Sequence, residues 1–184
     1  MLLVAFLMPG VLRAQGTLTV CNGIDSNEYV PIYGYYADDE QTSQMIFPSS
    51  MLTAMQGYAI EQMVFYVASD GGRDANLGNW DVSLGITSAS MLNGLDNSTA
   101  LTQVYSGPMI FDDNTNATMM IVSFYTPFVY NGGNLLVEFD HPVSADYNHY
   151  YFYGVTAASA SYSWDSSFNF LPKTTFSYAS CSRP

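Results

Sequence analysis

Residues 80–87 alternate strictly between apolar and small or polar side chains, and this stretch constrains the fold more than any other. Successive side chains of a β-strand point to opposite faces of the sheet, so an alternation of this kind predicts a strand with one face on a core. Its apolar members, which we expect to face that core, are Trp80, Val82, Leu84 and Ile86.

A second alternating stretch lies at residues 134–140 and carries two carboxylates on its outer face. One face holds Leu135, Val137 and Phe139, and the other holds Leu136, Glu138 and Asp140. Further runs of β-branched or aromatic residues lie at 60–68, 101–105, 118–125, 150–155 and 174–178. Clusters of Gly, Asn, Asp, Ser and Pro separate these runs, as turns between short strands do.

The pattern predicts an all-β fold, an antiparallel β-sandwich of jelly-roll type. Residues 48–57 form the one stretch with helical character, because Ser49 and Ser50 can cap a turn and Gly57 can end it. We therefore expect at most one short helical turn. A chain of 184 residues with 48% hydrophobic residues fits a single domain with a full core.

The charge balance is strongly acidic, with 16 carboxylates against four basic residues and a formal net charge of −12. Such a field repels phosphate groups, which excludes nucleic acid and anionic membrane surfaces as expected partners. A divalent cation would instead relieve repulsion between clustered acids.

The N-terminus predicts export. Residues 2–12 form an apolar run that is too short to span a bilayer, and Ala14-Gln15-Gly16 offers the small-x-small pattern of a cleavage site. We predict a signal peptide over residues 1–16 and a mature domain over 17–178, secreted or held at a bacterial cell surface without membrane insertion. The first basic residue, Arg13, follows the apolar run instead of preceding it, and a buried N-terminal strand is the alternative.

The cysteines, Cys21 and Cys181, lie near the two ends of this domain. They could form a disulfide in an oxidising compartment, since domain termini often lie close together. The alternative is lipidation of Cys21, although Val20 stands where a small residue is preferred. Residues 179–184 read as the start of a linker to a downstream domain.

Aromatic residues give the clearest sign of a binding surface. Sugar rings stack on aromatic faces, and Tyr or Trp next to polar residues suits that contact. The candidate ligand-binding residues are Tyr33, Tyr35, Tyr36, Tyr150, Tyr151 and Trp164. The alternative is that these rings fill the core.

Two acidic clusters are candidate calcium ligands, and we expect no other cofactor. They comprise Asp38 and Asp39, and Asp112, Asp113 and Asn114. The second begins like an EF-hand loop but has Ala117 where Gly is needed and Ser123 where the bidentate Glu is needed. Only a looser site would fit, and a solvated turn is the alternative.

No catalytic residue is predicted, and we expect a protein that is not an enzyme. Nucleophile elbows, zinc-protease motifs and phosphate-binding glycine loops are absent from the sequence. Glu138 and Asp140 lie roughly 7 Å apart by strand rise, a spacing that permits but does not indicate glycoside hydrolysis. His141 and His149 are expected at the surface, without further zinc ligands.

The segment Tyr29 to Tyr36 reads Tyr-Val-Pro-Ile-Tyr-Gly-Tyr-Tyr, and residues 169–176 read Asn-Phe-Leu-Pro-Lys-Thr-Thr-Phe. Together with stretches at 47–57, 130–137 and 152–156, they resemble an N-terminal β-sandwich domain of secreted surface proteins of gut Bacteroidetes. The resemblance covers about residues 19–178. It implies that fibronectin type III repeats follow the domain, and it supplies neither catalytic residues nor an established ligand.

These observations favour a non-catalytic binding or adhesion module that contacts a glycan or glycoprotein, with calcium as a candidate aid. A structural spacer that presents downstream repeats is one alternative. The other is a small glycoside hydrolase that uses Glu138 and Asp140.

Overall fold

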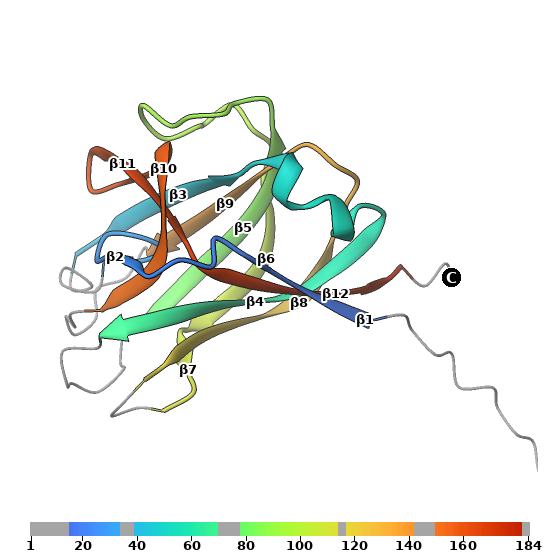
Figure 1. Cartoon of the computed structure of the whole chain (residues 1–184), viewed down its shortest axis with the longest axis horizontal. Coiled ribbons are helices and arrows are strands. Elements are labelled where there is room, and N and C mark those ends of the chain that lie inside the picture. The colour runs from blue at the N-terminus through green and yellow to red at the C-terminus, as the bar shows by residue number, and fades with distance from the viewer. Residues whose placement is uncertain (1–14, 34–38, 70–77, 114–116, 142–149, 182–184) are drawn as a thin grey trace, which may run out of the picture.

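The computed structural model describes residues 15–33, 39–69, 78–113, 117–141 and 150–181. In these ranges most residues belong to antiparallel strands, and two sheets pack face to face (Figure 1). The prediction of an all-β sandwich is confirmed.

Sheet A contains β1 (Gln15–Val20), β12 (Thr174–Ser180), β4 (Tyr58–Ser69) and β8 (Met119–Tyr130), with β7 (Ile110–Phe111) beside β8. Sheet B contains β3 (Gln41–Phe47), β9 (Asn134–His141), β5 (Asn79–Thr87) and β6 (Thr102–Pro108). The orders β1-β12-β4-β8 and β3-β9-β5-β6 are those of a jelly roll, in which successive strands pass between the two sheets as paired Greek keys.

A hairpin inserted between β9 and β12 extends sheet B beyond β3. It consists of β10 (Tyr151–Ser163) and β11 (Ser166–Pro172), and β2 (Asp25–Asn27) also pairs with β10. The two ends of β10 have different neighbours, because residues 161–163 pair with β3 while Tyr151 and Phe152 pair with β4. The hairpin therefore stands at the side of sheet B, where it can border a site on that sheet's outer face.

The core fills the space between the sheets, and the two alternating stretches supply much of it. Trp80, Val82 and Leu84 are fully buried, as are Leu135, Val137 and Phe139. Phe139 meets Phe65 of sheet A edge to face, with ring centroids 5.6 Å apart. Ile86 differs from the prediction because it is 42% exposed, at the end of β5 against the β8–β9 turn at Gly133.

Helical structure in the described residues amounts to two consecutive 3₁₀ turns, η2 (Ser49–Met51) and η3 (Thr53–Met55). They fall inside the predicted stretch and end before Gly57, whose φ of 84° favours glycine. Neither turn has the length or apolar character needed to span a membrane, and the described ranges hold no other helix.

The segment between β5 and β6, residues 88–101, folds over the outer face of sheet B; we call it the β5–β6 loop. Its Leu92 packs on Ile46 and Leu136, which point away from the main core and are nevertheless buried. Sequence patterning placed Leu136 with the polar residues of β9. The loop explains its burial and divides the outer face of sheet B into a covered half and an open half.

The predicted disulfide between Cys21 and Cys181 is wrong for this structure, in which both are free thiols. Val20 pairs with Thr174 at the beginning of β12, whereas Cys181 follows the last residue of β12, Ser180. Seven residues of extended chain separate these positions by roughly 23 Å, far beyond the reach of a disulfide. The final strand also extends past residue 178, the predicted end of the domain, and Ala179 is fully buried.

Candidate functional site

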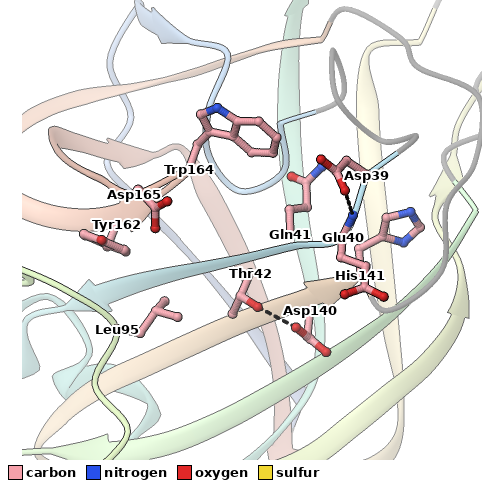
Figure 2. A pocket seen from close by; sticks show the side chains of 10 residues that line it. All are labelled: Asp39, Glu40, Gln41, Thr42, Leu95, Asp140, His141, Tyr162, Trp164 and Asp165. Atoms are coloured by element: carbon pink, nitrogen blue, oxygen red, sulfur yellow. Dashed lines mark hydrogen bonds between the residues drawn. The ribbon is translucent and has the colours of Figure 1, made fainter.

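A cavity of about 560 Å³ lies on the open half of the outer face of sheet B (Figure 2). We call it the sheet B groove. Its lining residues are Asp39, Glu40, Gln41, Thr42, Leu95, Asp140, His141, Tyr162, Trp164 and Asp165. They come from the start of β3, the end of β9, the β5–β6 loop and the tip of the β10–β11 hairpin, so only the folded chain brings them together.

The base of the groove is formed by neighbouring strands in register. Thr42 of β3 lies opposite Asp140 of β9, and the Thr42 hydroxyl donates a 2.6 Å hydrogen bond to that carboxylate. On the other side of β9, Asp140 lies opposite Asp81 of β5. Like charges directly opposite each other destabilise a sheet, so this pair of carboxylates on the outer face lowers the stability of the fold.

Glu138 lies two residues from Asp140 on the same strand face, as predicted, but it does not line the groove. It is half-buried, and the Gln44 amide donates a 2.7 Å hydrogen bond to it. Burial raises the pKa of the Glu138 carboxyl and the charge of Asp140 adds to this, while the bond from Gln44 opposes it. A raised pKa suits a general acid, but the two carboxylates do not face a shared cleft as glycoside hydrolysis requires.

The tip of the β10–β11 hairpin forms one side of the groove. Trp164 and Asp165 connect Ser163 to Ser166 and have φ values of 48° and 54°, as the two central residues of a type I′ turn require. Trp164 is 36% exposed, and its ring packs edge to face with the ring of Tyr33, with centroids 5.6 Å apart. The contact holds the indole at the rim and leaves part of its surface open to a ligand.

The β5–β6 loop forms the opposite side and is fastened to the sheet by Asp96. Its carboxylate accepts five hydrogen bonds, from the Thr87 hydroxyl and from the backbone and hydroxyl groups of Ser98 and Thr99. These bonds hold the pKa of Asp96 well below its ordinary value. The Gln44 amide pairs with the Asp96 backbone through bonds of 2.6 and 3.3 Å, which links this side of the groove to β3.

The predicted aromatic residues do not form one exposed surface. Tyr33 and Tyr150 are 8% and 1% exposed, and Tyr150 stacks on Phe111 with centroids 4.6 Å apart. Tyr151 is half-buried in β10, and Trp164 alone among the described candidates lines the groove. For Tyr33 and Tyr150 the alternative of core packing is therefore correct; Tyr35 and Tyr36 lie outside the described residues.

The predicted calcium ligands are divided between two places. Asp39 is exposed and lines the groove, whereas Asp112 and Asp113 follow β7. The Asp112 carboxylate accepts backbone bonds of 2.8 Å from Thr118 and Met119 and a further bond from the Thr118 hydroxyl, as a turn-stabilising residue does. Burial raises the pKa of Asp112, but these bonds outweigh it and the pKa is lowered.

No group of three or more acidic, histidine or cysteine side chains in the described residues is arranged to hold a metal ion. Asp38 and Asn114 lie outside those residues. His141, expected at the surface, is buried instead, because its ring stacks on Trp80 at 4.5 Å. Calcium binding therefore stays a prediction.

Sequence reasoning missed five residues that line the groove or lie at its base: Gln41, Thr42, Asp81, Leu95 and Asp165. Trp164-Asp165 is not one of the Asn-Gly or Asp-Gly pairs that signal a two-residue hairpin, so nothing marked it as a turn beside a ligand site. The acids of β5 and β9 could be recognised as outward-facing. Their pairing depended on strand order.

Fold and groove together define a jelly-roll β-sandwich with an acidic, aromatic-rimmed recess on one sheet. Comparisons with family models, with curated proteins and with solved structures find no match to this chain. The resemblance to surface proteins of gut Bacteroidetes stays a prediction.

Proposed function

We propose that the chain is a non-catalytic binding or adhesion module, secreted or at a cell surface, that holds a glycan in the sheet B groove. One observation carries the proposal: the exposed Trp164 indole borders the same recess as the Asp140 carboxylate and the Thr42 hydroxyl. A sugar presents apolar C–H faces that stack on an aromatic ring, and its hydroxyls donate hydrogen bonds to carboxylates. The volume also lies within the range of about 300–1,000 Å³ usual for ligand pockets.

A glycan and glycoprotein array probed with the purified full chain tests the proposal. The array is run with calcium and with chelator, because Asp39 and Glu40 add carboxylates to the rim of the groove. We expect selective binding that Trp164→Ala reduces by at least about fivefold, which corresponds to the loss of one aromatic stacking contact of about 1–3 kcal/mol.

The matched control is Tyr125→Ala, which removes a 71% exposed aromatic ring from β8 of sheet A. If Tyr125→Ala lowers glycan binding as much as Trp164→Ala does, the groove is not the binding surface. Near-ultraviolet circular dichroism establishes that each variant keeps its fold.

A structural spacer is the second candidate, and the burial of Tyr33 and Tyr150 favours it. A spacer needs no exposed aromatic patch and binds nothing on the array. A blank array from a folded sample would therefore replace the binding proposal with this one.

A further inference from the structure

Among the described residues, the charged side chains that line the sheet B groove are all acidic. Four carboxylates line it, on Asp39, Glu40, Asp140 and Asp165, and Asp81 lies opposite Asp140 on the adjoining strand. Thr42 gives one hydroxyl hydrogen bond to Asp140, which does not neutralise its charge.

No basic side chain in the described residues offsets these carboxylates. Lys173 is the only lysine or arginine within the described ranges, and its ammonium lies 4.3 Å from the ring centroid of Tyr66, on β4 of sheet A. A recess with charges of one sign and low-dielectric sides focuses the field, so the local potential exceeds what the net charge of −12 produces elsewhere.

We propose that the sheet B groove excludes anions, so that it admits neutral or cationic glycans and rejects those that carry sialic acid, uronic acid or sulfate. This inference rests on the proposed function and names the ligand class for it. Asp140 and Asp165 are the carboxylates that test this discrimination, because both line the groove that Trp164 borders, one from the end of β9 and one from the tip of the β10–β11 hairpin.

The groove contains its own reporter of local charge, which needs no ligand. The chain has two tryptophans, of which Trp80 is fully buried and Trp164 is 36% exposed. Excitation at the red edge of the absorption band selects tryptophan over tyrosine. Small solutes in water then quench the exposed Trp164 and not the buried Trp80, so the quenching reports on Trp164. Acrylamide is neutral and iodide is an anion, so the ratio of their quenching constants measures the potential at the groove.

At constant ionic strength we expect the ratio of iodide to acrylamide quenching to be about threefold lower for the protein than for free N-acetyltryptophanamide, the Boltzmann factor for a potential near one kT. Asp140→Asn and Asp165→Asn should each raise this ratio. Asn keeps the size of Asp140, and at position 165 it tolerates the positive φ.

Glu61→Gln is the matched control, because it removes the same charge from β4 of sheet A. If it raises the ratio as much as Asp140→Asn does, net charge and not the groove repels iodide, and the inference is overturned. A ratio equal to that of free tryptophan overturns it as well. Both results leave the proposed function standing.

Glycans printed as matched pairs, each neutral form beside its sialylated and sulfated forms, test the ligand class directly. We expect binding to the neutral members, and a gain of binding to the anionic members in Asp140→Asn. Equal binding of both forms by the unmodified chain overturns the inference alone, whereas a blank array overturns the proposed function and the ligand class with it.

Discussion

The outer faces of the two sheets differ although both arise from the same alternation of side chains. On sheet A, the hydroxyl of Thr175 lies 2.7 Å from that of Thr19 and 2.8 Å from that of Tyr66, and Lys173 lies over the Tyr66 ring. These polar groups satisfy one another. On sheet B, half of the outer face is buried under the β5–β6 loop and half presents the carboxylates of the groove.

The comparison shows that the outward side of a strand is not equivalent to a solvated side. The covered half of sheet B stabilises the fold and shapes a recess, and the open half holds charges at a cost in stability. The proposed binding surface lies on the face whose charged groups are least satisfied by their own neighbours.

The largest expected effect is on the covered half of sheet B. Leu136→Ala removes a fully buried side chain beneath the β5–β6 loop and should lower the free energy of unfolding by about 2–4 kcal/mol. The matched control is Val64→Ala on sheet A, a partly exposed position of β4. Denaturant unfolding measures both, and equal losses would contradict the distinction between the two faces.

A smaller effect is expected where Asp96 fastens the β5–β6 loop. Asp96→Ala removes the acceptor of five hydrogen bonds and should cost about 1–3 kcal/mol. The folded-state pKa is lowered, so the ionised carboxylate contributes stability above its ordinary pKa near 4, and this contribution is lost as pH falls.

Denaturant midpoints measured between pH 7 and pH 3 follow this contribution. The difference in stability between the unmodified chain and Asp96→Ala should shrink as pH falls below about 4. If this difference in stability is constant between pH 7 and pH 3, the charge of Asp96 does not stabilise the fold.

Glu138→Gln should stabilise the protein slightly at neutral pH. The pKa of Glu138 is raised, so the charged form is disfavoured in the folded state, and stability is lost as pH rises through that raised pKa. A neutral side chain removes the repulsion from Asp140, for a gain of a few tenths to about 1 kcal/mol. Thermal unfolding at pH 4 and pH 7 checks this, and Glu61→Gln on sheet A should give no comparable gain.

The smallest effect is expected on the outer face of sheet A. Tyr66→Phe removes the hydroxyl that lies 2.8 Å from Thr175, a partly exposed contact worth about 0.5 kcal/mol. The loss should not change with salt concentration, because both groups are neutral. Denaturation in low and high salt measures it, and a loss as large as that of Asp96→Ala would mean that the two faces are equally anchored.

Patterns within single strands predicted much of the fold. Trp80, Val82 and Leu84 face the core as expected, because alternation with a period of two depends only on local backbone geometry. The same reasoning placed Glu138 and Asp140 on one face of β9. It placed Leu136 on that same outer face but did not predict its burial, since the covering loop lies between β5 and β6, some 40 residues earlier in the chain.

The candidate site was predicted only in part, through Trp164, Asp39 and Asp140. Tyr33 and Tyr150 were assigned to the surface because a Tyr-rich run does not show which rings meet a neighbour, and the fold places both in buried aromatic contacts. The cysteines flank the domain, which made a bridge between them one possible arrangement, yet antiparallel pairing of β1 with β12 places them at opposite ends of β12.

The sequence by itself determined the β class, the core face of the two alternating strands and the acidic character of the surface, because these depend on composition and on geometry within a strand. Only the tertiary structure decided which half of sheet B is covered and that Trp164 borders the same recess as Asp140. Contacts between residues so distant in the sequence are set by strand order and register. These depend on the packing free energy of the whole sandwich and not on any single strand.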